Sequence, residues 1–299
     1  MVTLTRPQRE IPNVPLAFRS PYMVKYKDLF KDEDTMNKLV TDYAYSGKDQ
    51  SELLYYDGVN SINREEMKTL EGDTLVVNNV IDSWAVLLNQ KRSKNKLYFS
   101  TFPHQIMYAN TVCPEGSSME LRIAYFKERI TNELRLYKIK SAVGYQQIFF
   151  PVAIYAHFYL LCIDHINETM HIIDNRKLPK HQTIATKYEN QPQLVLKGYA
   201  EYLKGLGYED ADSIEKYKVV LQKMKWRSNE DYTNCGVYIM KHMETFTADP
   251  NEEWVCDLKP NNVNQIRKLR VQYTAELMLN EGNRQSQNNR RAARRFAQA

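Results

Sequence analysis

The sequence predicts an α+β domain, and three observations lead to this fold class. Runs rich in β-branched and aromatic residues lie in the middle of the 299-residue chain, mostly between residues 148 and 173. Amphipathic helical patterns lie toward both ends of the chain. Strands grouped in one part of a chain and helices in others are typical of an α+β domain, and we see no internal repeat.

The first 60 residues are predicted to form an N-terminal arm and an accessory helix. Residues 1–24 contain four prolines, which favour an extended chain over a helix. Apolar residues on one side of 27–45 predict a helix. A short strand is expected over 53–59, because that run ends at the turn signal Asp57-Gly58.

Residues 61–282 are predicted to form the main domain. A capped helical turn is expected at 63–67, and an apolar stripe along 80–88 predicts a core helix. Further helices are expected at 121–140, 194–203 and 266–277, the last of which stops at Gly282. Strands are expected at 97–102, 148–163, 170–173 and 219–224.

Residues 283–299 are predicted to be a basic, disordered tail. The net charge of the chain is +5, and residues 284–299 hold five arginines and no acidic residue. Without these arginines, 36 basic and 36 acidic residues remain, so we expect no nucleic-acid-binding surface on the main domain. The tail is either a solvated end or a segment for nuclear import or nucleic-acid binding.

The four cysteines are expected to be free thiols in a reducing, intracellular compartment. They form no CxxC pair and no spacing typical of metal ligands, and no secretory signal is visible at the N-terminus. We therefore expect no metal site. We expect Cys162 in the core, Cys113 in a loop and Cys256 as a second exposed thiol. No apolar run approaches about eighteen residues, so no membrane span is expected.

The segment Asn234-Cys235-Gly236-Val237-Tyr238 is predicted to turn from a loop into an amphipathic helix. Apolar residues recur at spacings of three along 237–246, and the side-chain oxygen of Asn234 can accept from the first free amides as an N-cap. Cys235 would lie in the first turn. The helix dipole favours an anion there, so this thiol should ionise more easily. A buried structural cysteine is the alternative for this residue taken alone.

A β-hairpin is predicted on both sides of the polar residues 165–168. A turn centred between His165 and Ile166 would place His157 directly opposite Asp174. The carboxylate could then hold the imidazole in one tautomer and leave the other ring nitrogen free to take the proton of a thiol. A core histidine and a turn aspartate are the alternatives. Asp164 is a rival acid, but it lies near the turn.

Three short motifs carry a resemblance to a known family. His157-Phe158-Tyr159-Leu160, Asp174-Asn175 and Asn234-Cys235-Gly236-Val237-Tyr238 resemble the His-Trp-x-Leu, Asp-Ser and Asp-Cys-Gly-[Val/Ile]-[Phe/Tyr] motifs of the ubiquitin-like-protein-specific (SUMO) cysteine proteases. The seventeen-residue gap from His157 to Asp174 and the run from Lys68 to Ile81 are also similar. The resemblance covers about residues 62–282. The residues around the cysteine look most like plant members, including those carried by transposable elements.

The resemblance implies a fold of the papain-like cysteine protease superfamily, with a central mixed or antiparallel sheet, flanking helices and the nucleophile at a helix N-terminus. It implies Cys235 as nucleophile, His157 as general base and acid, and Asp174 as the residue that orients the histidine. No cofactor or metal is implied.

Four positions depart from the pattern of that family. Asn229 replaces a glutamine that donates to the oxyanion, and loss of such a donor typically costs about 10²–10³ in rate. Leu75 and Phe158 replace two tryptophans that clamp the Gly-Gly tail of the substrate. Asn234 replaces the aspartate that precedes the cysteine.

We therefore expect a thiol protease or isopeptidase that hydrolyses the bond after the C-terminal Gly-Gly of SUMO or a related ubiquitin-like protein, in the nucleus or nucleocytoplasm. The second hypothesis is a catalytically weak or inactive module of the same fold that binds ubiquitin-like proteins. The third is a nucleic-acid-associated protein that uses the arginine-rich tail.

Overall fold

The computed structural model describes residues 35–72, 74–91, 95–109, 112–228, 231–249 and 253–298. The predicted N-terminal arm, the first part of the helix predicted at 27–45, and Asn229 lie outside these ranges. No helix among the described residues is both long and apolar enough to cross a membrane.

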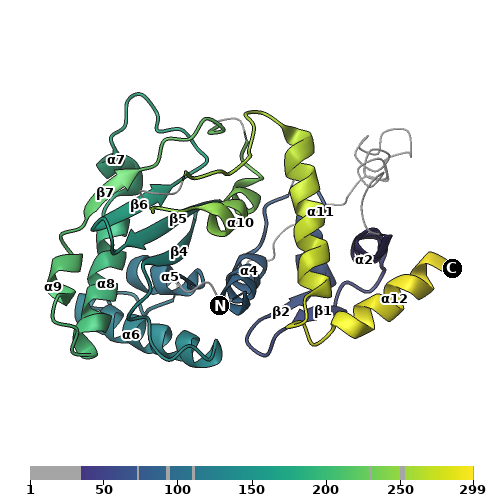
Figure 1. The fold of residues 1–299 in the computed structure, drawn as a ribbon, viewed down its shortest axis with the longest axis horizontal. Helices are drawn as coiled ribbons and strands as arrows, with labels where there is room; N and C mark the ends of the chain where they lie inside the picture. Colours follow the sequence, from purple (N-terminus) through teal and green to yellow (C-terminus); the bar gives the residue numbers. More distant parts are fainter. Residues whose placement is uncertain are drawn as a thin grey trace, which may run out of the picture.

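A five-stranded mixed sheet forms the centre of the molecule (Figure 1). Its strands, in spatial order, are β3 (Lys96–Tyr98), β4 (Gln147–Ile154), β5 (His157–Asp164), β6 (Thr169–Ile173) and β7 (Lys218–Leu221). The central strands β4, β5 and β6 pair antiparallel, whereas β3 and β7 join the two edges in parallel. The predicted α+β class is confirmed.

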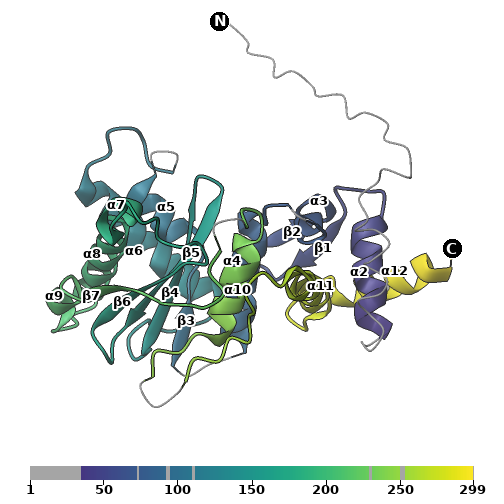
Figure 2. The same cartoon turned by 90° about the horizontal axis from the view of Figure 1, so that it is seen from above.

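Helices cover both faces of this sheet, which explains why its central strands are apolar on both sides. Leu160 and Cys162 of β5 face a core that they share with α4 (Asn78–Gln90) and α10 (Cys235–Thr245). Leu161 and Ile163 face the opposite core. That second core includes residues of α5 (Phe102–Tyr108), α6 (Met119–Leu136) and α8 (Gln191–Gly205). Figure 2 shows the sheet between these two helical layers.

A smaller group of elements adjoins α4 and α10. It contains α2 (Thr35–Ser46), the β1–β2 hairpin (Leu53–Tyr56 and Ser61–Asn63), α3 (Arg64–Met67), the 3₁₀ turn η3 (Lys68–Leu70), α11 (Val263–Leu279) and α12 (Ser286–Gln298). Figure 1 shows α2, α11 and α12 together on the side of α10 away from the sheet. The chain ends of the main domain are therefore brought together here, beside the helix that begins at Cys235.

The disordered tail predicted for residues 283–299 is wrong, because α12 is a helix from Ser286 to Gln298. Asn289 is buried, and its side-chain amide donates to the carbonyls of Leu54 (2.7 Å) and Met278 (3.1 Å). Ala293 is also fully buried. Ala293 and the hydrogen-bonded Asn289 thus lie on one face of this arginine-rich helix, and that face packs against the domain.

The predicted register of the hairpin is also wrong. Leu160 pairs with Ile173 and Asp164 with Thr169, so the turn is centred one residue later than expected. Asp164 fixes this turn because its carboxylate accepts from the backbone N–H groups of Ile166 (3.0 Å) and Asn167 (3.3 Å).

Besides α12, the described residues include further helices that the periodicity did not predict: α5, α7 (Ile184–Tyr188) and α9 (Ala211–Ile214). The strand expected at 97–102 ends at Tyr98, because Pro103 lies in the first turn of α5.

Candidate active site

Cys235 is the first residue of α10, and its side chain is fully buried. Gly236 allows α10 to approach the segment that precedes α4. A Cβ atom added at Gly236 would lie 2.7 Å from Cβ of Val76, which is closer than two such atoms can approach. Glycine at this position therefore brings Cys235 next to the chain that carries Leu75.

Asn234 precedes α10, but the structure corrects its predicted role as a side-chain cap. Its side chain makes no hydrogen bond to the free amides of the helix. The amide nitrogen donates to Asp231 (2.8 Å), and the oxygen accepts two hydrogen bonds from the buried guanidinium of Arg270 (2.9 and 2.7 Å). The start of α10 is thus held by α11, and the Asn234 side chain does not cap its first amides.

His157 begins β5 directly after a two-residue turn. Tyr155 and Ala156 both have positive φ angles, 46° and 59°, as in the tight turns that match the twist of paired strands. Nε2 of His157 lies 3.0 Å from Oδ1 of Asp174. Nδ1 of the same ring is buried and has no hydrogen-bond partner among the described residues. One ring nitrogen is therefore held by a carboxylate, while the other is free for a proton.

Asp174 is buried and fully hydrogen-bonded. Besides His157, Oδ1 accepts from the backbone N–H of Arg176 (2.8 Å). Oδ2 accepts from Nζ of Lys187 and from the hydroxyl of Tyr188, both at 2.8 Å. Burial acts to raise the pKa of this carboxyl, but His157 and Lys187 outweigh it and hold the pKa well below its ordinary value. Asp174 is therefore ionised, and Nε2–H of His157 donates to it.

The electrostatics of Cys235 correct the expectation that this thiol ionises easily. Burial raises its pKa above the ordinary value, because a thiolate loses water there. The backbone N–H groups of Phe158 and Gly236 and the charge of Arg176 act in the opposite direction. Burial outweighs these contributions in the free protein, so a nearby base would assist formation of the thiolate.

Comparison with known proteins identifies the fold. No protein-family model and no curated protein sequence matches this chain. The structure is similar to the C-terminal protease domain of Ulp1 in complex with Smt3, the yeast orthologue of SUMO, at 15% identity. The match covers 84% of this chain and 96% of that one, with a TM-score of 0.59.

This chain has a Ulp1-like protease fold. A structure of Ulp1 with its catalytic cysteine oxidised to a sulfenic acid matches at 13% identity with a TM-score of 0.59, over 84% of this chain and 96% of that one. The Ulp1-like SUMO protease catalytic domain from Chaetomium thermophilum matches at 15% identity with a TM-score of 0.51, over 82% and 89%.

Within the Ulp1-like fold, Leu75 and Phe158 line one hollow of about 470 Å³ together with Ala156 and Glu66. Phe158 is nearly buried, whereas Leu75 is 36% exposed. The hollow lies beside the start of α10, since Val76, which lines it, is against Gly236. The two positions expected to clamp a substrate tail therefore share one apolar hollow next to the thiol.

Several residues that support this site were not predicted from the sequence. Lys187, Tyr188 and Arg270 lie far along the chain from the residues they bind, and no spacing links them to Asp174 or Asn234. The one local signal in the sequence is Thr183, which caps α7, the helix that carries Lys187 and Tyr188.

The other cysteines lie away from this machinery. Cys256 was expected to be exposed but is buried, and burial raises its pKa to about 11. Cys162 is buried in β5 as part of the core, and the Cys113 thiol lies 3.5 Å from the carbonyl oxygen of Ile106. In the described part of the chain, no cluster of three or more histidines, cysteines or acidic residues is arranged to hold a metal ion.

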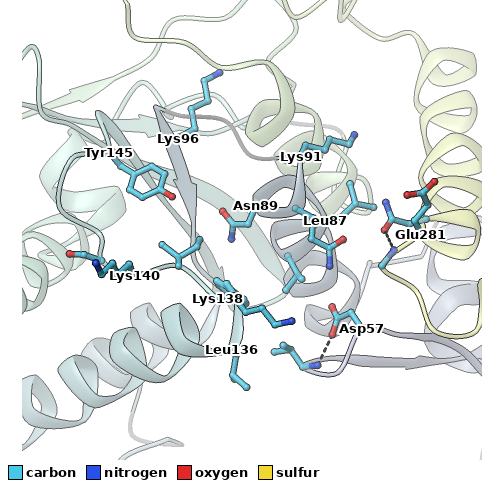
Figure 3. Close-up of a pocket in the computed structure, with 18 of the residues that line it drawn as sticks. Asp57, Leu87, Asn89, Lys91, Lys96, Leu136, Lys138, Lys140, Tyr145 and Glu281 are labelled. Carbon is cyan, nitrogen blue, oxygen red and sulfur yellow. Dashed lines mark hydrogen bonds between the residues drawn. The ribbon is translucent and has the colours of Figure 1, made fainter.

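A larger hollow of about 1180 Å³ lies elsewhere, between the C-terminal end of α4, the segment after α6 and the end of α11. Figure 3 shows Lys91, Lys96, Lys138 and Lys140 around it, together with Asp57. None of the predicted catalytic or clamp residues lines this hollow, so size alone does not mark the active site of this fold.

Proposed function

We propose that this protein is a cysteine protease that hydrolyses the bond after the C-terminal Gly-Gly of SUMO or a related ubiquitin-like protein. The observation that carries the proposal is the 3.0 Å contact of His157 Nε2 with Asp174 in a Ulp1-like fold, which leaves a buried Nδ1 without a partner among the described residues. A nuclear or nucleocytoplasmic location and a similarity to plant members stay predictions.

The proposed reaction begins when Nδ1 of His157 takes the proton of the Cys235 thiol. The thiolate attacks the carbonyl carbon of the terminal glycine, and the backbone N–H of Cys235 donates to the oxygen that becomes negative. His157 then gives its proton to the leaving amine as the carbon–nitrogen bond breaks. A water molecule, deprotonated by His157, hydrolyses the thioester and restores the thiol.

Asp174 contributes by stabilising the imidazolium that forms in each step. Its other hydrogen bonds, from Arg176, Lys187 and Tyr188, keep the carboxylate fixed and ionised. Asn229 would supply a second oxyanion donor in this proposal. The small apolar hollow of Leu75 and Phe158 would hold the Gly-Gly tail, since glycines bring no side chains to a narrow space.

A non-catalytic module that binds ubiquitin-like proteins is the second candidate. Two observations favour it: the Cys235 side chain is fully buried, with a raised pKa, and Leu75 gives the hollow no flat aromatic wall. Such a protein would keep the docking surface of the fold without efficient turnover.

A ubiquitin-like protein that carries a C-terminal electrophile tests the proposal. We expect a covalent adduct with the natural protein, no adduct with Cys235→Ser, and an adduct with the control Cys256→Ser, which removes a different buried thiol. Tight binding without an adduct would support the binding module. An adduct that persists in Cys235→Ser would contradict the assignment of the nucleophile.

A further inference from the structure

A cluster of cations lies beside the proposed catalytic residues, and the guanidinium groups of Arg176 and Arg227 take part in no step of the reaction described above. Arg176 follows Asp174 by two residues, and Arg227 lies in the loop between β7 and α10. Nε and a terminal nitrogen of Arg227 donate to the carbonyl of Arg176 (3.3 and 3.0 Å), and Nζ of Lys187 approaches the same carbonyl (3.3 Å). Two positive side chains, those of Arg227 and Lys187, therefore converge on the backbone of the turn that carries Arg176.

The positive charge of this cluster is only partly neutralised. Asp174 is the one carboxylate that any of the three cations contacts among the described residues, through Lys187. The side chains of Arg176 and Arg227 form no ion pair there, and Nε of Arg176 is buried without a hydrogen-bond partner. Two guanidinium groups thus retain donors for an anion.

The cluster is also held in place rather than loosely exposed. The guanidinium of Arg176 lies 5.0 Å from the ring centre of Tyr232, three residues before Cys235. The backbone N–H of Ser228 donates to the carbonyl of Asn175 (2.8 Å) and joins the same two loops. The Arg176 side chain therefore connects the loop after Asp174 with the loop that precedes Cys235.

The strand order separates this cluster from the apolar hollow. Ala156, in the β4–β5 turn, lines the hollow on the β4 side of His157. Arg176 follows β6 and Arg227 follows β7, on the other side of β5. A substrate whose segment before the scissile bond lies in the hollow, with the bond at Cys235, would therefore have its following segment next to the cations.

We propose that Arg176 and Arg227 form a subsite for acidic residues of the protein or peptide that follows the scissile bond. This inference rests on the proposed function, because it places the Gly-Gly tail in the hollow of Leu75 and Phe158. Its physical basis is charge complementarity: an acidic side chain would gain charge-assisted hydrogen bonds, whereas a basic one would be repelled.

Three ubiquitin-like fusion substrates test this subsite. They differ only in the segment after Gly-Gly, which contains glutamates, glutamines or lysines at the same positions. We expect the natural protein to cleave the glutamate substrate about two- to fivefold faster in kcat/KM than the glutamine substrate, as for an exposed charge pair, and the lysine substrate most slowly. Added salt should reduce the preference.

The matched variants are Arg176→Gln and Lys216→Gln. Arg176→Gln removes the contact with Tyr232 but no side-chain hydrogen bond of the described residues, and Lys216 is an exposed cation at the opposite end of β7. We expect the glutamate-to-glutamine ratio to fall close to one in Arg176→Gln and to stay unchanged in Lys216→Gln. Equal cleavage of the three substrates, or a ratio that Arg176→Gln does not change, would overturn the subsite alone. Cleavage of none of them would overturn the proposed function and the subsite with it.

Discussion

Arg270 donates two hydrogen bonds to the side-chain oxygen of Asn234, at 2.9 and 2.7 Å. The same buried guanidinium donates to the carbonyls of Thr69 (2.8 Å) and Thr74 (2.9 Å). Asn234 precedes Cys235, and Thr74 precedes Leu75. One side chain of α11 therefore fixes both the start of the nucleophile helix and the segment that lines the apolar hollow.

We predict that Asn234→Leu destabilises the protein by about 3 kcal/mol, because it leaves part of a buried cation without its acceptor. Asn234→Asp should cost less than Asn234→Leu, about 1–2 kcal/mol, since a carboxylate still accepts from Arg270 but no longer donates to Asp231 and is repelled by it. Urea unfolding of the natural protein and both variants measures these values. Equal losses in the two variants would show that the contact with Arg270 is unimportant.

Asp174→Asn is expected to lower kcat/KM by about 10³–10⁴-fold while the protein stays folded. The amide can no longer stabilise the charged imidazole, and its nitrogen can turn toward Nε2 and favour the wrong tautomer. Steady-state kinetics on a Gly-Gly fusion substrate measure the loss. Asp164→Asn is the matched control, because Asp164 is equally buried but binds His171 and the hairpin turn. A comparable loss in that control would indicate general damage to the sheet.

The contact between His157 and Asp174 was predicted from a pairing that the structure does not have. Continued past the end of β6, the observed register would place His157 opposite Arg176 and diagonal to Asp174. A diagonal neighbour lies within reach of a long side chain, so the imidazole still meets the carboxylate. Residue types and approximate spacing were sufficient to propose the pair, whereas the register depended on hydrogen bonds within the turn.

Local periodicity predicted the elements whose apolar faces are complete in the sequence, such as the helix at 80–88 and the central strands. It could not predict interactions or burial that depend on residues distant along the chain. The hydrogen bonds of Lys187 to Asp174 and of Arg270 to Asn234 are examples, as is the burial that raises the pKa of Cys235. The polar composition of 286–298 likewise gave no sign of a helix, because one of its partners, Leu54, is remote in sequence.

We predict that the backbone amides of α12 are protected from hydrogen exchange, with slow exchange centred on Asn289 and Ala293. Asn289→Ala should lower the free energy of unfolding by about 1–2 kcal/mol, because it removes two hydrogen bonds to buried carbonyls that Asn283 then has to satisfy alone. Asn288→Ala, an exposed neighbour, is the control and should change it by less than about 0.5 kcal/mol. Rapid exchange throughout α12 would instead support the prediction that residues 283–299 are disordered.

The burial of His242 leads us to predict that the free energy of unfolding depends on pH. It is fully buried in α10, and its Nε2 accepts from the indole N–H of Trp226 (3.1 Å). Burial lowers its pKa to about 3, whereas a histidine in the unfolded chain titrates near 6.5. Between these two values the unfolded state binds a proton that the folded state excludes. The stability associated with neutral His242 is therefore present above about pH 6.5 and is lost as the pH falls toward 3.

His242→Gln removes this titration but keeps an oxygen that can accept from Trp226. We expect the unfolding free energy of the natural protein to fall more steeply than that of His242→Gln between about pH 6 and pH 4. The difference should approach 1.4 kcal/mol per pH unit, the value for one proton. Urea unfolding across this range measures it. The exposed His181→Gln should follow the natural protein, and parallel curves for the natural protein and His242→Gln would show that His242 is already protonated in the fold.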